Sequence, residues 1–114
     1  MPIKNRTKDR LLHENSVFCG DAFSKFVGLM FSFDKNRSLI FKFGKERIIS
    51  LHMLFVFYPI DVLFLNSKKV IVDIKENFKP FTFYSSKRKT MYVVELPAGV
   101  IKKSRTKLGD KIEF

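Results

Sequence analysis

The segment 50–76 constrains the fold most, because it is dense in β-branched and aromatic residues. Such residues suit buried or half-buried strands. Pro59 interrupts the first apolar run of the segment and Asn66–Lys69 interrupts the second, which predicts two successive hairpins. Val62–Leu65 is apolar on both alternating faces, and a central strand covered on both sides explains that pattern. We therefore expect all four of these side chains to be buried.

The remaining patterns predict short strands separated by turns, with two short helices. A helix is expected after Asp21, which has the character of an N-cap, and a second helical turn is expected from Pro97. Gly44–Arg47 is expected to be a turn. The fold class predicted is mainly β: a single compact barrel-like or sandwich domain of about seven short strands with two short helices. The further strands are expected at residues 15–19, 38–43, 48–57, 70–75, 91–96 and 111–114.

The length of 114 residues fits one domain, and the 46% of hydrophobic residues argues against intrinsic disorder. Residues 1–14 are mostly polar or charged and are interpreted as a basic N-terminal arm, with residues 15–114 as a single β-rich domain. An extended arm would carry Lys4, Arg6, Lys8 and Arg10 on one side. The alternative is a flexible arm that is frayed in solution.

Cysteine and histidine are scarce in this chain. Cys19 is the single cysteine, so no internal disulfide can form. The N-terminus lacks the apolar region of a secretion signal, which predicts a reducing, cytoplasmic location. His13, His52 and Cys19 do not have the spacing of a metal site, so we expect neither a metal nor a cofactor. The longest apolar run contains His52, Pro59 and Asp61 and is therefore not expected to span a membrane.

Three motif segments together resemble a known family. They are Gly28–Phe31, then His52 followed by Pro59–Leu65, and finally Val94–Gly99 followed by Gly109-Asp110. Their order and spacing resemble the family called domain of unknown function 192. The resemblance implies a compact β-rich domain with short helices and no settled biochemical activity.

Candidate acid–base residues are His52, Asp61 and Glu95. Asp61 begins the doubly apolar strand, where a carboxylate is costly unless it is paired or hydrogen-bonded. One interpretation is that Asp61 holds the Tyr58-Pro59 turn by accepting backbone N–H groups. The other is a ligand-binding or catalytic role, in which His52 would be its acid–base partner. Glu95 allows the same two interpretations.

The net charge of +11, from 22 cations and 11 acids, permits an anionic partner such as RNA or DNA. Aromatic residues at Phe81–Tyr84 lie next to a basic cluster, as in single-stranded nucleic-acid platforms. A lysine-rich surface is also typical of thermophile proteins. The nucleic-acid-binding candidates are Lys87, Arg88, Lys89, Lys102, Lys103 and Arg105.

These patterns favour an uncharacterised protein that acts as a small non-enzymatic binding or interaction module. The first alternative is a basic nucleic-acid-binding module. The second is an enzyme with an acid–base site at His52 and Asp61. A cleft holding His52, Asp61 and Glu95 would favour the enzyme, whereas a continuous positive face with exposed aromatics would favour nucleic acid.

Overall fold

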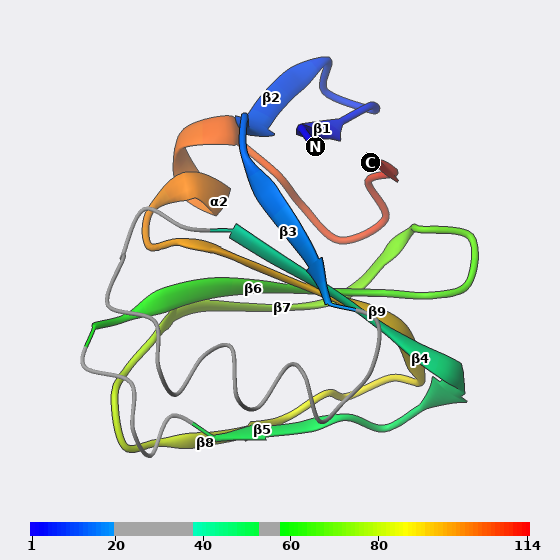
Figure 1. The fold of residues 1–114 in the computed structure, drawn as a ribbon, viewed down its shortest axis with the longest axis vertical. Helices are drawn as coiled ribbons and strands as arrows, with labels where there is room; N and C mark the ends of the chain where they lie inside the picture. Colours follow the sequence, from blue (N-terminus) through cyan, green and yellow to red (C-terminus); the bar gives the residue numbers. More distant parts are fainter. Residues whose placement is uncertain (20–37, 53–57) are drawn as a thin grey trace.

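A five-stranded sheet forms the centre of the molecule (Figure 1). The computed structural model describes residues 1–19, 38–52 and 58–114. The first two strands of the sheet are parallel and its other neighbours are antiparallel. In spatial order the strands are β3 (Ser16–Cys19), β4 (Ser38–Arg47), β9 (Thr90–Pro97), β6 (Ile60–Leu65) and β7 (Ile71–Phe78).

A small second sheet and a short helix lie on one side of the central sheet, at the top of Figure 1. This sheet has the order β10–β1–β2, and the helix is α2. A two-stranded ribbon, β5–β8, lies on the other side. The bounds of these elements are β1 (Ile3–Asn5), β2 (Arg10–His13), β10 (Ile112–Glu113), α2 (Val100–Ser104), β5 (Ser50–His52) and β8 (Phe83–Ser85).

Each face of the central sheet is covered by its own apolar core. Val62 and Phe64 belong to the cluster that includes Leu51 of the ribbon, whereas Leu63 and Leu65 belong to the cluster on the α2 side. All four residues of Val62–Leu65 have zero exposed surface. The prediction of a central strand buried on both faces is confirmed, because the two layers cover alternate side chains of β6.

The hairpin predictions have a mixed outcome. β6 and β7 pair in antiparallel fashion around Asn66–Lys69, which confirms the second hairpin. The first hairpin is wrong, because β5 pairs with β8 while β6 pairs with β7 and β9. The turn expected at Gly44–Arg47 is also wrong, because β4 continues to Arg47 through a break in its register with β9.

The mainly β class is confirmed, although the sheets are open and do not close into a barrel in the described part of the chain. The described residues form ten strands, where about seven were expected. They contain one helix, α2, which begins after Gly99. A helix therefore follows the Pro97 region as expected, but it begins at Val100 because Pro97 still belongs to β9. The helix expected after Asp21 lies outside the described residues.

The N-terminal segment, expected as an arm, carries β1 and β2. β1 pairs with β2 and β10, and both Ile3 and Asn5 are fully buried. This pairing joins residues near the two ends of the described chain. The division of the chain near residue 14 stays a prediction.

Candidate functional site

Asp61 is a buried carboxylate at the start of β6. Its Oδ1 accepts a hydrogen bond from the Asn77 N–H at 2.9 Å. Its Oδ2 accepts hydrogen bonds from the N–H groups of Gly99 at 3.0 Å and Ile101 at 3.1 Å. Three backbone donors therefore compensate the cost of burying this charge. Asp61 therefore links β6 to the end of the neighbouring strand β7 and holds the beginning of α2 against the central sheet.

The partners of Asp61 differ from those considered in the sequence. The described hydrogen bonds run to residues 16 to 40 positions away, and not to the turn at Tyr58-Pro59. Local sequence can indicate that a buried carboxylate needs donors. It does not indicate which distant backbone groups supply them.

Glu95 and Asp61 lie on opposite faces of the central sheet. Glu95 is opposite Val62 in the β6–β9 ladder and shares its side, toward the ribbon core. Asp61 is opposite Leu96, which belongs to the core on the α2 side. The backbone of His52 lies in the ribbon, opposite Phe83. The fold thus does not bring Asp61 and Glu95 together in one cleft.

A second buried carboxylate, Asp110, joins the chain's distant segments. Its Oδ2 accepts hydrogen bonds from Asn5 Nδ2 at 2.9 Å and from the Lys107 N–H at 3.0 Å, and it forms an ion pair with Lys8 at 2.9 Å. Asn5 Nδ2 also donates to Thr106 Oγ1 at 3.0 Å. Burial raises the pKa of Asp110, but the hydrogen bonds and the charge of Lys8 outweigh it, so the net pKa is lowered.

Asp73 plays a similar role on the ribbon side of the sheet. Its Oδ2 accepts hydrogen bonds from the Tyr84 hydroxyl at 2.7 Å and the Lys87 N–H at 2.9 Å. Burial and the contact with the Asp73 carboxylate raise the pKa of Tyr84 to about 12. Asp73 therefore anchors β8 and the start of the basic β8–β9 loop. Asp73 was not singled out from the sequence, and Asp110 was named there only within the third motif segment.

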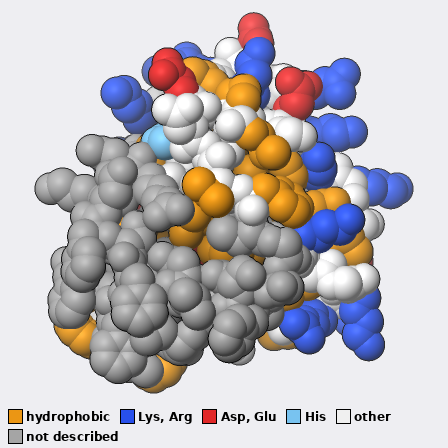
Figure 2. Space-filling view, in the orientation of Figure 1, with side chains coloured by type: hydrophobic (Ala, Val, Ile, Leu, Met, Phe, Trp, Pro, Cys, Tyr) orange, Lys and Arg blue, Asp and Glu red, His pale blue; other side chains and the backbone are white. Residues whose placement is uncertain are grey.

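The six candidate nucleic-acid-binding residues fall into two exposed groups. The β8–β9 loop carries one group, and α2 with its C-cap carries the other. α2 lies in the layer on one side of the central sheet, whereas the β8–β9 loop leaves the ribbon on the other side (Figure 1). On the face shown in Figure 2, Lys and Arg spread around the margin and do not form one block. The groups are Lys87, Arg88 and Lys89, and Lys102, Lys103 and Arg105.

Exposed aromatics accompany the first of these groups. Phe81 is 57% exposed and Phe83 is 72% exposed, and both precede the β8–β9 loop in the chain. Phenylalanine is commonly packed in protein cores, yet these two side chains keep most of their surface in solvent. Cations and aromatic faces therefore occur within one short segment of the surface.

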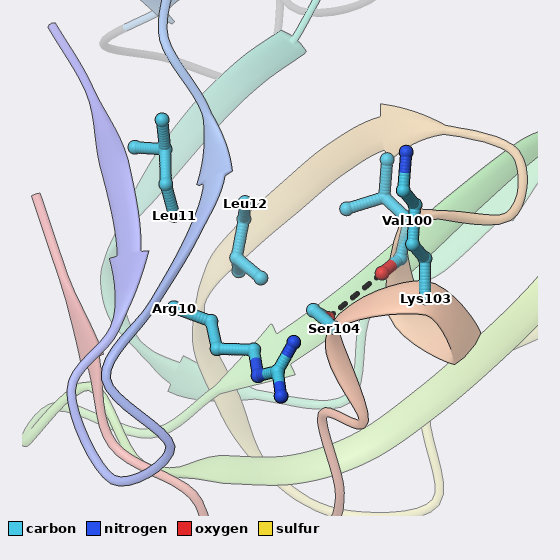
Figure 3. Close-up of a pocket in the computed structure, with 6 residues that line it drawn as sticks. All are labelled: Arg10, Leu11, Leu12, Val100, Lys103 and Ser104. Carbon is cyan, nitrogen blue, oxygen red and sulfur yellow. Dashed lines mark hydrogen bonds between the residues drawn. The ribbon is translucent and has the colours of Figure 1, made fainter.

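A hollow of about 250 Å³ lies between β2 and α2 (Figure 3). We refer to it as the β2–α2 hollow. Apolar side chains make up half of its lining residues, and two cations and a serine complete it. Its lining residues are Arg10, Leu11, Leu12, Val100, Lys103 and Ser104.

Within the described ranges, no cluster of three or more His, Cys, Asp or Glu side chains could hold a metal ion. None of the helices in that part of the chain has the length and apolarity needed to cross a membrane. The arrangement described above instead combines buried structural carboxylates with exposed cations.

The model of the DUF192 family, described as uncharacterised ACR, matches residues 6–114. The chain belongs to the DUF192 family. It is 38% identical to a UPF0127 protein of Pyrococcus furiosus over 112 residues, covering 96% of this chain and 95% of the relative. It is 35% identical to a UPF0127 protein of Pyrococcus horikoshii, covering 98% and 97%.

Two solved structures share the fold. A candidate transcription regulator from Sinorhizobium meliloti has a TM-score of 0.84 and 27% identity, with 98% of this chain and 89% of that chain covered. A protein of unknown function from Novosphingobium aromaticivorans has a TM-score of 0.85 and 23% identity, with 100% and 84% covered. The second likeness concerns the fold alone.

Two of the segments that carry the DUF192 resemblance meet in the structure, whereas Gly28–Phe31 lies outside the described residues. Asp61 from the central motif accepts the N–H of Gly99, which ends the Val94–Gly99 motif. Gly99 has φ of 95°, a left-handed conformation that favours glycine at this position before α2. These motif residues are therefore joined as one structural device that fixes the start of α2 on β6.

Proposed function

We propose that this DUF192 protein is a non-enzymatic module that binds an anionic partner. The observation that carries the proposal is the different placement of three aspartates and of the two candidate cation groups. Asp61, Asp73 and Asp110 are buried and hydrogen-bonded within the fold, whereas the cations of α2 and the β8–β9 loop face solvent. The acids stabilise the scaffold, and the exposed cations supply the surface on which an anion can bind.

Single-stranded nucleic acid is the specific partner favoured by the β8–β9 loop. Exposed Phe81 and Phe83 offer faces for base stacking, and Lys87–Lys89 offers charges for phosphates. The description of the S. meliloti structure as a candidate transcription regulator agrees with a nucleic-acid partner. Phosphate contacts predict weak sequence preference and strong salt dependence.

The test is a fluorescence-anisotropy titration with a labelled single-stranded RNA at several salt concentrations. The triple variant K87A/R88A/K89A should bind more weakly, and its log–log salt slope should be smaller in magnitude by about 2, since each phosphate contact to a single strand contributes about 0.7. The same titration of K102A/K103A/R105A reports whether α2 takes part.

The matched control is K4Q/K68Q/K111Q, which removes three exposed lysines outside both groups. It should retain the salt slope of the parent protein more closely than the loop variant does. Equal losses in the two variants would contradict a localised site and leave a diffuse charge effect. A parallel titration with labelled polyglutamate tests whether the partner is an acidic polypeptide. Absence of binding to both RNA and polyglutamate at low salt would contradict the proposed function.

The enzymatic alternative uses His52, Asp61 and Glu95. The separation of Asp61 and Glu95 by the central sheet weighs against a shared acid–base site. The three backbone hydrogen bonds to Asp61 favour its structural interpretation. The binding module is therefore the better supported of the two functions.

A further inference from the structure

The β2–α2 hollow has an apolar wall contributed by two different elements. Leu12 of β2 is 6% exposed and belongs to the core on the α2 side, and Val100 of α2 packs against the same core. Leu11, also on β2, keeps 48% of its surface exposed. In Figure 3 the side chain of Leu12 points toward α2 and that of Leu11 points away from it, so Leu12 and Val100 supply the apolar wall. An apolar group that entered the hollow would cover their remaining exposed surface, and that burial is favourable.

Two cations border the apolar wall. In Figure 3 Arg10 extends from β2 toward α2 and ends near Ser104, whereas Lys103 runs alongside Val100. Neither cation forms an ion pair with a carboxylate of the described residues, in which the ion pair observed is Lys8–Asp110. Ser104 Oγ already interacts with the carbonyl of Val100 at 2.7 Å. Charge recognition in the hollow therefore depends on Arg10 and Lys103.

We propose that the β2–α2 hollow binds a small anion with an apolar body, such as a carboxylate on a short hydrocarbon chain. The apolar body would contact Leu12 and Val100, and the anionic head would interact with Arg10 or Lys103. The volume of about 250 Å³ lies below the roughly 300–1,000 Å³ of pockets for drug-sized ligands, so the occupant is small. The inference goes beyond the proposed function, because it assigns a small-molecule ligand to a second anion-binding surface.

The apolar lining distinguishes this ligand from the alternatives. A purely ionic phosphate would leave the apolar wall exposed to water, and a neutral hydrocarbon would remove water from two cations without pairing them. An anion with an apolar body satisfies both parts of the hollow. The β2–α2 hollow is also separate in space from the loop at Lys87–Lys89.

Octanoate is the probe for a test on the full chain by methyl NMR. Titration should shift the methyl signals of Leu12 and Val100 more than those of Leu11, with a dissociation constant in about the millimolar range, as expected for so small a ligand. Hexanoate should bind more weakly by up to about 15-fold, because it lacks two methylenes. 1-Octanol, which has no charge, and octylamine, which has the opposite charge, should bind less well than octanoate.

The variants R10Q and K103Q should each weaken octanoate binding about two- to fivefold. K102Q is the matched control, because Lys102 is an exposed neighbour on α2 that does not line the hollow. A dispersed amide spectrum of each variant would verify that the variant remains folded. Equal affinity for 1-octanol, equal effects of K102Q and K103Q, or shifts confined to other methyl groups would each overturn the proposal.

The RNA titration separates failure of this inference from failure of the wider function. RNA binding without octanoate binding would reject the hollow as a ligand site and retain the anion-binding module. Octanoate binding without binding of either polymer would support the hollow and remove the polymer-binding surface.

Discussion

Buried aspartates connect elements that are far apart in the chain. Asp110 is the clearest case, because it receives hydrogen bonds from Asn5 near the N-terminus and from the Lys107 backbone in its own turn. Its contact with Lys8 combines a hydrogen bond with an ion pair. Protonation of the Asp110 carboxyl group would remove its negative charge. It would thereby weaken the hydrogen bonds from Asn5 and Lys107 and the ion pair with Lys8.

Acid should therefore destabilise the protein through Asp110. The folded pKa is lowered, so the stabilisation is present above the unfolded pKa of about 3.9 and is lost as the pH falls through the folded pKa. Asp110→Asn should be less stable than the parent near neutral pH, and the difference should narrow below about pH 4. Urea unfolding over this pH range measures it, with exposed Asp9→Asn as control. A difference that stays constant with pH would contradict this assignment.

Sequence reasoning reached part of this residue-level picture. Asp61 could be singled out because it begins an apolar strand, where a charge needs compensation. Asp110 lies in a polar turn, so nothing local marks it as buried. Asp73 lies between Val72 and Ile74 in an apolar strand, so the signal that marked Asp61 could also have marked Asp73. The separation of 105 residues between Asn5 and Asp110 places their contact beyond any local pattern.

At the scale of elements, β6 should carry much of the stability. Phe64 is fully buried in the ribbon-side core, and its ring centroid lies 5.6 Å from that of Tyr84. Phe64→Ala should cost about 3–5 kcal/mol of unfolding free energy, because it leaves a cavity in a packed core. Equilibrium urea unfolding measures this cost.

Phe83→Ala provides the matched control for Phe64→Ala, since it removes the same atoms from a side chain that is 72% exposed. Its cost should be within about 0.5 kcal/mol, as is usual for surface positions. A loss below about 1 kcal/mol for Phe64→Ala would show that β6 tolerates the cavity and is not the centre of the core.

The elements that sequence predicted well are those specified by local signals. The hairpin of β6 and β7 follows from two apolar runs around a polar turn. The presence of a helix after the Pro97–Gly99 turn was also predicted, although α2 begins at Val100 and not at Pro97. The pairing of β5 with β8 and the parallel pairing of β3 with β4 join distant segments. Such pairings depend on which layers cover the central sheet, and no local pattern specifies that arrangement.

For the whole molecule, the two explanations of its charge predict opposite effects of salt. A net charge of +11 produces repulsion that weakens a compact state, whereas the ion-pair networks of thermophile proteins are attractive. Within the described residues, the ion pair observed joins Lys8 and Asp110. The placement of charges therefore indicates that repulsion among the cations outweighs attraction between ion pairs.

Added sodium chloride should accordingly raise the free energy of unfolding. Increasing the salt from about 10 mM to about 1 M shortens the Debye length from about 30 Å to about 3 Å and screens repulsion among the exposed cations. Urea unfolding at several salt concentrations measures the effect without adding a charged denaturant. K4Q/K68Q/K111Q lowers the charge from +11 by three, to +8, and should show a smaller rise. A fall in the free energy of unfolding with added salt would instead show that attractive ion pairs dominate. The lysine-rich surface would then be explained by thermal adaptation, and its cations would not be available to an anionic partner.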